Sequence, residues 1–303
     1  MADFLTFENL VDECERGLKQ YGGAKGDLVK NAINMVYLNE MLTVDNLHPL
    51  HWLVDFDDTL ASKAPSVITG ITAADPGVIT TSAVHGLAAG DIISIYSIAG
   101  MTELNNRMFR VNSAPSTTTL DLIDIDGLDE ISTSTYTTYV SDGVINHRGI
   151  PLATTGKNVQ RILKCMWHGE EPMTPITYDE LEKYEDWWDE STELPSRYYL
   201  RKKYTTAGVE SNHLLWFHGA DAAYDLRYWF ELRPTKLVDD DSVPLLPNQF
   251  HYAIVAGVLM RLAEQGIQVE NQAIWPSIYS AQLEQLKQFN RKEYTKNKHY
   301  LKA

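Results

Sequence analysis

At 303 residues, the chain is long enough to bury an extensive core and to form one or two domains. Apolar residues make up 44% of it and charged residues 22%, which is typical of globular proteins and excludes a wholly disordered chain. The formal net charge of −15 excludes non-specific nucleic-acid binding by the surface as a whole, because phosphate contacts need Lys and Arg.

Three short helices are predicted in the first 60 residues. Residues 4–20 carry apolar side chains at three- and four-residue spacing, and Tyr21-Gly22-Gly23 ends this helix. A second helix spans about residues 27–42, and a third begins near His48-Pro49 and runs towards Leu60. Three helices in succession predict a small bundle.

The sequence changes character after Pro65. Residues 66–143 are rich in Ile, Val, Thr, Tyr and Ser between turn residues, the pattern of a small all-β unit. Nine acidic residues against two arginines give this segment a net charge of −7. Because helical and mixed sequence flanks it on both sides, we predict an inserted β barrel or sandwich. Its expected strands are Val67–Thr72, Val78–Ser82, Ile92–Ile98, Phe109–Ala114, Thr118–Ile123 and Thr135–Tyr139.

After Gly143 the sequence predicts antiparallel strands and then helices. The expected strands are Val159–Trp167, Tyr198–Lys203, His213–His218 and Tyr224–Leu232, and the expected helices are Tyr178–Glu190, Asn248–Gln265 and Pro276–Phe289. The predicted fold class is therefore α+β, with an N-terminal helical bundle, C-terminal helices with antiparallel strands, and a small inserted all-β domain. The expected parts are a discontinuous body (residues 1–65 and 144–289), the inserted β domain (66–143) and a C-terminal segment (290–303).

The C-terminal segment differs in charge from the acidic remainder. Between Lys287 and Lys302 there are six cations and one acid, a net charge of +5, with aromatic residues between them. Aromatic and cationic side chains together suit an acidic, apolar-lined groove, which favours a segment that folds on a partner. A solvated, disordered terminus is the alternative. The expected docking residues are Phe289, Arg291, Lys292, Tyr294, Lys296, Lys298 and Tyr300.

The sequence carries no signal for export or membrane insertion. Its first residues lack the basic and apolar segments of a secretory signal, and no stretch approaches the roughly 18 apolar residues of a membrane span. The two cysteines, Cys14 and Cys165, form no Cys-x-x-Cys pair, which indicates ordinary reduced thiols. We therefore expect assembly in a cytosol and no membrane partner.

The motifs of common enzymes are missing or incomplete. Gly156-Lys157-Asn158 lacks the Ser or Thr that follows the lysine of a phosphate-binding loop, and Pro151 stands where that loop needs a glycine. His48 and His51 are a candidate metal pair, but a His-Pro at the start of a helix and a packed or solvated histidine is the simpler interpretation.

Residues 185–190 are the best candidate for catalysis. Carboxylates beside Trp187 and Trp188 are typical of sugar binding and acid–base hydrolysis. Neighbouring helix positions point in different directions, so these carboxylates are not expected to converge on one bond, and we interpret the tryptophans as anchors of a helix against the sheet. We predict a protein that is not an enzyme, with no catalytic residue, no cofactor and no metal site.

The insert contains a dense set of turn motifs. They are His85-Gly86-Leu87-x-x-Gly90-Asp91 and Gly100-Met101-Thr102-Glu103-Leu104-Asn105-Asn106-Arg107, followed by Phe109-Arg110-Val111. This pattern is similar to the small β domain first described in ubiquitin-activating enzymes, which is common as a module in tailed-phage structural proteins. The resemblance implies no ubiquitin chemistry, and the insert contains no cysteine. The motif residues are His85, Gly86, Gly90, Asp91, Gly100, Asn105 and Arg107.

The order of elements outside the insert carries a second resemblance. The Tyr- and Leu-rich segment 224–232 is followed by Arg233-Pro234, then by the acidic run Asp239-Asp240-Asp241 and by Leu246-Pro247 ahead of the long helix. Together with the N-terminal helical bundle, this order resembles the head-to-tail adaptor (connector) proteins of tailed phages.

The resemblance implies a structural subunit of a phage neck. Such subunits form a ring, commonly of twelve, that docks on the portal protein, joins the head to the tail and lines the channel for DNA passage. The implied partners are the portal protein, other copies of the chain, tail or nozzle proteins, and genomic DNA that passes without sequence-specific binding. The implied location is the head–tail neck of the virion, assembled in the host cytoplasm. The alternatives are another virion tail or baseplate protein with the same β module, and a carbohydrate-binding or carbohydrate-hydrolysing protein centred on Trp187 and Trp188.

Overall fold

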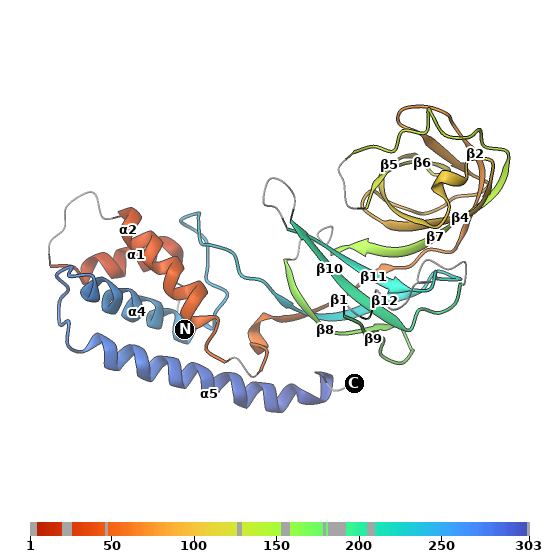
Figure 1. The fold of residues 1–303 in the computed structure, drawn as a ribbon. Helices are drawn as coiled ribbons and strands as arrows, with labels where there is room; N and C mark the ends of the chain where they lie inside the picture. Colours follow the sequence, from red (N-terminus) through yellow and green to blue (C-terminus); the bar gives the residue numbers. More distant parts are fainter. Residues whose placement is uncertain are drawn as a thin grey trace. The chain divides into compact units, whose positions relative to one another are not determined.

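The chain folds into two compact units. The computed structural model describes residues 5–19, 26–45, 48–125, 129–152, 158–177, 180, 192–204 and 210–301 (Figure 1). Residues up to Asp55 together with those from Glu231 onward form one unit, which we call the helical unit; residues Phe56–Phe230 form the other, the strand unit. The first is mostly helical and the second mostly strand, which confirms the α+β class.

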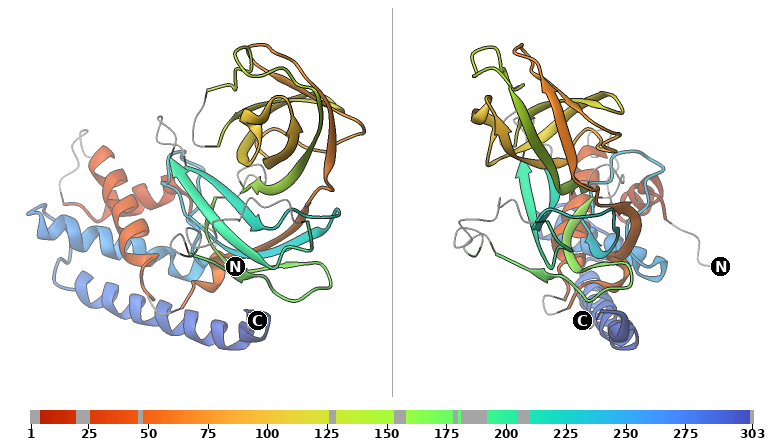
Figure 2. Two further views of the ribbon diagram at one scale, coloured as in Figure 1. Left: turned by 45° about the vertical axis from the view of Figure 1, so that its right-hand side comes forward. Right: turned by 90° about the vertical axis from the view of Figure 1, so that its right-hand side faces the viewer.

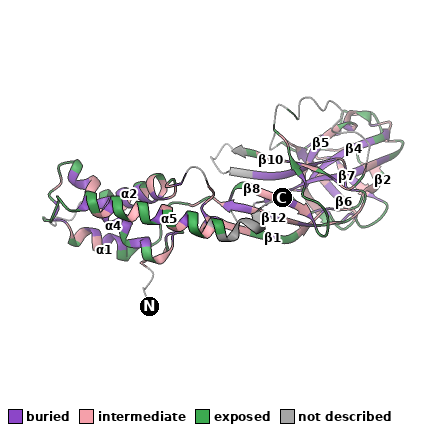
Figure 3. Cartoon of the chain, turned by 90° about the horizontal axis from the view of Figure 1, so that it is seen from below, coloured by how far each residue is buried: buried purple, intermediate pink, exposed green. Residues whose placement is uncertain are grey.

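The helical unit is built around α4 (His251–Glu264), which is apolar on almost every side and buried along its length (Figure 3). Its neighbours are α1 (Phe7–Arg16), α2 (Gly26–Met35), the π-helical segment η1 (Val36–Met41) that continues α2, and α5 (Trp275–Leu301). Short 3-10 turns η2 (His51–Leu53) and η5 (Asn248–Phe250) complete the unit. The helices expected at 4–20, 27–42 and 248–265 are confirmed, with somewhat different ends.

A capping box begins α1. The hydroxyl of Thr6 accepts a hydrogen bond from the backbone N–H of Asn9 at 3.3 Å, and Asn9 Oδ1 accepts one from the N–H of Thr6 at 3.2 Å. These bonds satisfy two donors that the first turn of a helix leaves without partners. The local sequence therefore fixes the start of this helix.

A glycine lets three helical segments meet closely. A Cβ atom at Gly257 of α4 would lie 2.7 Å from Tyr279 Cε2 of α5 and 2.7 Å from Val36 Cγ1 of η1, closer than such contacts allow. The Tyr279 ring cannot easily move aside, because it is buried and its hydroxyl donates to Glu40 Oε2 at 2.9 Å. Glycine is therefore required here for packing, not for backbone conformation.

The prediction of a helix from His48 towards Leu60 is wrong. After η2 the chain enters strand β1 (Val54–Ala61), which pairs with β12 (Asp225–Leu232). Aspartate and threonine, which make up half of β1, are weak helix formers. The partner strand lies about 170 residues away in the sequence, so local periodicity does not reveal it.

The prediction that the last helix ends at Phe289 is also wrong, because α5 continues to Leu301. No Gly or Pro occurs after Pro276, and the segment is rich in Lys, Arg, Glu and Gln, which favour helix. The lack of a continuous apolar face in 290–301 suggests an earlier end, but an apolar face governs packing rather than helix propensity. The C-terminal segment is thus mostly an extension of α5.

The first part of the strand unit is a closed barrel (Figure 2). Its strands follow the order β2-β3-β6-β5-β4-β7, and β7 pairs with β2 through Ser66 opposite Ile145 to close the sheet. Closure leaves none of the six strands as a free edge. The strands are β2 (Ser66–Ile71), β3 (Val78–Thr81), β4 (Ile92–Ala99), β5 (Arg107–Ser116), β6 (Thr119–Asp124) and β7 (Ser141–Pro151), with the short turn η3 (Thr102–Leu104) after β4.

The sequence predicts most of the barrel. The first five expected strands of the insert are confirmed as β2 to β6, and their alternating apolar residues, such as Ile93, Ile95 and Phe109, fill the barrel interior. The strand expected at 135–139 is wrong: that segment forms a turn whose Tyr139 hydroxyl donates to the Ile68 and Asp142 carbonyls, and the next strand is β7. The sequence does not predict β7 as a strand, because glycines and polar residues interrupt its apolar pattern.

The remaining strands form two sheets. The strand β7 continues past the barrel to pair with β11 (Glu210–Phe217), followed by β10 (Arg197–Tyr204) and the short β9 (Thr174–Pro175). The strands β1, β12 and β8 (Val159–Trp167) form a separate three-stranded sheet. The four strands expected after Gly143 are therefore confirmed. Because β7 serves both the barrel and the following sheet, an independently folding domain over 66–143 stays a prediction.

The helix expected at 178–190 lies outside the described residues, apart from Glu180. The residues at its expected start do make capping contacts: Glu180 N–H donates to Thr177 Oγ1 at 3.3 Å, and Thr177 N–H donates to Glu180 Oε2 at 2.8 Å. This reciprocal pair is the arrangement of a capping box. It agrees with Thr177 as the N-cap of that helix.

The contact at Gly257 can be tested by adding one methyl group. In an open helix interior, Gly→Ala stabilises by about 1 kcal/mol through helix propensity. At Gly257 the collision with Tyr279 and Val36 should outweigh that gain, and we expect Gly257→Ala to lower the free energy of unfolding by about 1–2 kcal/mol. Urea denaturation followed by circular dichroism measures the change.

Gly26→Ala is the matched control, because Gly26 also lies in a helix but a Cβ atom added there would meet no other atom within 4 Å. It should leave stability unchanged or raise it slightly. Equal effects of the two substitutions would show that the close approach at Gly257 does not constrain the fold.

Candidate functional site

The described residues hold no group of three or more His, Cys, Asp or Glu side chains placed to bind a metal ion. The two histidines that the sequence marked as a metal pair have separate partners: His48 Nδ1 lies 3.4 Å from Asp45 Oδ2, and His51 Nδ1 lies 3.2 Å from Asn290 Oδ1. Trp187 and Trp188 lie outside the described residues. None of the described helices is long and apolar enough to cross a membrane.

Four motif residues of the insert form one turn of the barrel. The ring of His85 accepts a hydrogen bond at Nδ1 from the Leu87 N–H (3.0 Å), and Gly86 follows with φ +63°. Gly90 has φ +96°, and a side chain there would collide with Pro151 of β7. Asp91 accepts from the Ala88 N–H at 2.9 Å. These residues shape the chain before β4, and the geometry gives each of them a structural role.

The other three motif residues form the turn after β4. Asn105 replaces a strand neighbour: its Oδ1 accepts from the Ile98 N–H, and its Nδ2 donates to the Ile98 carbonyl, both at 2.9 Å. Gly100 has φ +96°, and a Cβ there would collide with the Thr138 carbonyl oxygen. Arg107 donates to the Glu103 carbonyl at 3.2 Å, and its guanidinium lies 4.9 Å from the Phe109 ring centroid.

The most informative surface element for assembly is α5, the helix that carries the predicted docking residues. Its first half packs on the helical unit through side chains at three- and four-residue spacing, including Trp275, Tyr279 and Leu286. Since α4 begins at His251 and Phe250 lies 5.6 Å from Phe289, ring centroid to ring centroid, α5 reaches the start of α4 at about Phe289. The helix then continues for twelve more residues.

Phe289 is partly buried and packs against the core of the helical unit. Its ring centroid lies 5.2 Å from that of His51 and 6.4 Å from that of Trp52, in addition to its contact with Phe250. Phe289, one of the predicted docking residues, therefore has a structural role within this chain. Its side chain supports α5 at the position where the helix leaves α4.

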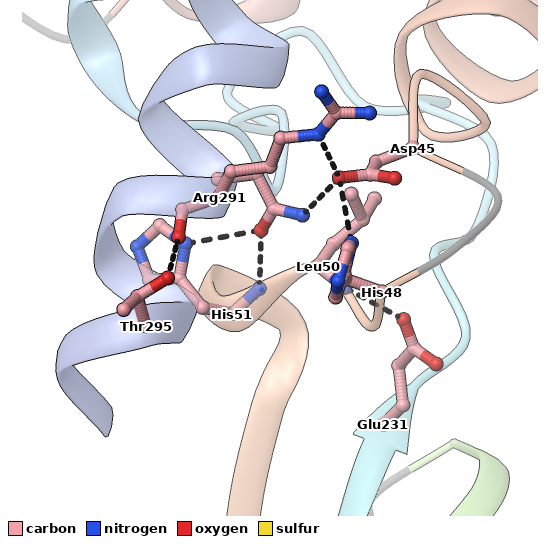
Figure 4. A network of polar contacts seen from close by, with 8 residues as sticks. Asp45, His48, Leu50, His51, Glu231, Arg291 and Thr295 are labelled. Atoms are coloured by element: carbon pink, nitrogen blue, oxygen red, sulfur yellow. Dashed lines mark hydrogen bonds and ion pairs between the residues drawn. The ribbon is translucent and has the colours of Figure 1, made fainter. Parts of the chain in front are cut away.

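A buried polar network follows immediately at Asn290, which is fully inaccessible to solvent (Figure 4). Asn290 Oδ1 accepts from the His51 N–H at 3.0 Å, and Asn290 Nδ2 donates to Asp45 Oδ2 at 3.3 Å. The Asp45 side chain is only 1% exposed, and Arg291 Nε also lies 3.5 Å from its Oδ2. Nearby, Glu231 Oε1 accepts from the Leu50 N–H at 3.2 Å. The network joins α5 to Asp45 and His51.

Sequence reasoning missed Asn290 and Asp45 as important positions. Their only signal is periodic: Asn290 falls four residues after Leu286, on the face of α5 that is otherwise buried. A polar residue on such a face is expected to have hydrogen-bond partners. The partner Asp45 cannot be found from the sequence, because it lies 245 residues away.

Beyond Asn290 the helix has distinct rows of residues. At 100° per residue, positions 294, 297 and 301 fall within about 40° of Asn290 around the helix axis. These positions are Tyr, Asn and Leu, whereas Arg291 and Lys298 share a different row. Lys292 is exposed, and Arg291 is about half exposed while it contacts Asp45. The helix backbone thus puts positions 294, 297 and 301 on the side of Asn290, and positions 291 and 298 on a different side.

The two thiols are unsuited to nucleophilic or redox chemistry. Cys14 and Cys165 are buried in different units, and burial raises the pKa of both thiols well above the ordinary value. The thiolate is the reactive form.

We therefore expect neither cysteine of the folded protein to react with Ellman's reagent at pH 8, whereas the protein in denaturant should release two equivalents of chromophore. Fast reaction of the folded protein would contradict this, and Cys14→Ala and Cys165→Ala would identify the thiol.

The comparison with protein families gives one match. The family model described as SU10 adaptor protein matches residues 99–298 of the 303, from the end of β4 to near the end of α5. The search of curated proteins gave no match. The matched segment includes half of the barrel, the strands β8 to β12, α4 and nearly all of α5. Because it covers well over half of the sequence, the chain belongs to the SU10 adaptor protein family.

Proposed function

We propose that this chain is a structural subunit of a phage neck that docks on the portal protein and joins the head to the tail. The observation that carries the proposal is the match to the SU10 adaptor protein family, which extends through α5 to residue 298. The role is one of assembly rather than catalysis, and the chain is a virion component that assembles in the host cytoplasm. The alternative of a carbohydrate-binding protein is centred on Trp187 and Trp188, which lie outside the described residues, and stays open.

The proposed docking element is the end of α5. Its net positive charge contrasts with the acidity of the rest of the chain, so it suits an acidic surface on the portal. Because this segment is helical, it can dock as a preformed helix laid in a groove, with less ordering cost than a disordered tail. The proposed contacts are Arg291, Lys292, Tyr294, Lys296, Lys298 and Tyr300, with Phe289 as their support.

In a ring of subunits, weak contacts of each subunit with the portal would be sufficient for stable docking. In a ring, commonly of twelve copies in such adaptors, each subunit meets an equivalent site on the portal, and repeated contacts add through effective concentration. The net charge of −15 also suits a channel wall, because it repels DNA phosphates over about one Debye length, roughly 8 Å at physiological salt. We further propose that the barrel contacts the next neck or tail component or the host surface.

Docking can be tested by shortening α5. A chain that ends at Glu293 keeps Phe289, Asn290 and Arg291, and should therefore unfold at nearly the same temperature as the full chain. It should fail to co-sediment with purified portal rings of the same phage, because the basic and aromatic positions beyond 293 are gone. Raised salt should weaken the full-length complex only in part, since aromatic contacts are not screened.

A full-length variant with Lys292, Lys296 and Lys298 changed to Gln controls for helix length, since glutamine also favours helix. It should bind portal weakly and lose most of the salt dependence. Undiminished portal binding by the shortened chain would show that docking lies elsewhere. Copy number in the particle then separates a neck ring from a tail or baseplate protein.

A further inference from the structure

We infer that Asp45 and Asn290 form a clamp that sets the direction and rotation of the docking end of α5. The inference rests on the proposed function in one respect only: it assumes that the end of α5 is what binds the portal. The clamp itself is a property of the free subunit and can be measured without a partner.

The clamp lies where α5 loses the support of α4. Up to Phe289 the helix packs against α4 and the η5 turn, and Asn290 is the next residue. The eleven residues from Arg291 to Leu301 extend about 16 Å further at 1.5 Å per residue. A change of 10° in the helix axis at Asn290 would move the far end by about 3 Å, and a rotation by one residue would turn it by 100°. A small change in the direction or rotation of the helix at Asn290 therefore produces a larger displacement of the docking residues.

The hydrogen bonds of Asn290 fix both the position and the rotation of the helix. The amide oxygen accepts from the His51 N–H at 3.0 Å and lies 3.2 Å from His51 Nδ1, which donates to it in the tautomer that carries its proton on Nδ1. The amide nitrogen faces Asp45 on the other side at 3.3 Å. Asparagine has only two side-chain torsions, so an amide held at both ends allows little rotation of its backbone. An apolar side chain at 290 would lack these directional bonds.

The burial of the Asp45 carboxylate also indicates that this residue specifies the position of α5 rather than adding stability. Its side chain is 1% exposed and is surrounded by Asn290 Nδ2, Arg291 Nε and His48 Nδ1, at 3.3, 3.5 and 3.4 Å. Buried ionic groups are often no more stabilising than well-packed apolar residues of similar volume. Where they persist, they can specify one register among several, as polar residues do in helical coiled coils. Here the register specified is that of α5 against residues 45–51.

The clamp makes a prediction that separates positioning from stability. In Asn290→Leu the helix should remain, because leucine extends the apolar row of Tyr279 and Leu286, but the thermal midpoint should fall slightly, because the His51 N–H and the Asp45 carboxylate each lose a hydrogen-bond partner. Portal binding should nevertheless weaken at least tenfold. The matched control is Gln288→Leu, a similar amide-to-leucine change two residues earlier at an exposed position. It should leave portal binding unchanged.

The direction of the helix is measured in the free subunit by pulsed electron spin resonance. Spin labels are attached at Asp12→Cys in α1 and at Lys298→Cys in α5, in a background where the native cysteines are replaced by alanine. The distance distribution should be narrow in the parent and in Gln288→Leu. It should broaden or shift in Asn290→Leu and in Asp45→Asn, which keeps the volume of the carboxylate but removes its charge.

Each outcome decides the inference. An unchanged distance distribution in both Asn290→Leu and Asp45→Asn would overturn the clamp, whether or not the parent binds portal. Should Asn290→Leu fail to fold, Asp45→Asn carries the same test alone. A changed distribution together with a parent that does not bind portal would retain the clamp and reject the proposed docking partner.

Discussion

The contact between α4 and α5 determines how the helical unit presents its C-terminal helix. The two helices approach closely because Gly257 has no side chain, and the ring of Tyr279 occupies that space. A polar cluster fixes the same contact at its surface, where Glu40 accepts from the Tyr279 hydroxyl and from Arg261 at 2.9 and 3.0 Å. Burial and the bond to Glu40 raise the pKa of Tyr279, so this hydroxyl stays a donor at any physiological pH. The position at which α5 leaves α4 follows from this packing.

The polar residues at the end of that contact have a different physical role from the apolar ones. Burial of Tyr279, Leu286 and Phe289 stabilises α5 against the unit but tolerates sliding and rotation, because the hydrophobic effect has no direction. Asn290 and Asp45 add directional bonds at the last supported residue. The apolar burial thus contributes stability, and the hydrogen bonds contribute a defined direction of the helix.

In the strand unit, β7 connects the barrel to the sheet that follows it. Its first half closes the barrel against β2 and β4, and its second half pairs with β11. Gly149 allows the backbone of β7 to approach β11, because a Cβ there would lie 2.5 Å from the Leu214 carbonyl oxygen. Barrel and sheet thus share a continuous strand rather than a flexible linker. The segment 66–143, whose sequence has a net charge of −7, contains the strands β2 to β6 and the start of β7.

The sequence by itself determined the elements whose signals are local: α1, α4 and five of the barrel strands, read from periodicity and turn residues, and the change from an acidic chain to a basic end. It also carried the resemblance to phage adaptors, which the family match supports. Only the tertiary structure decided that 54–61 is a strand, since its partner β12 supplies hydrogen bonds from about 170 residues away. The same holds for Phe289, whose neighbours His51 and Trp52 occupy it within the unit, and for the Asp45–Asn290 contact across 245 residues. Periodicity describes one segment at a time, whereas hydrogen bonds and packing between distant segments depend on how the whole chain folds.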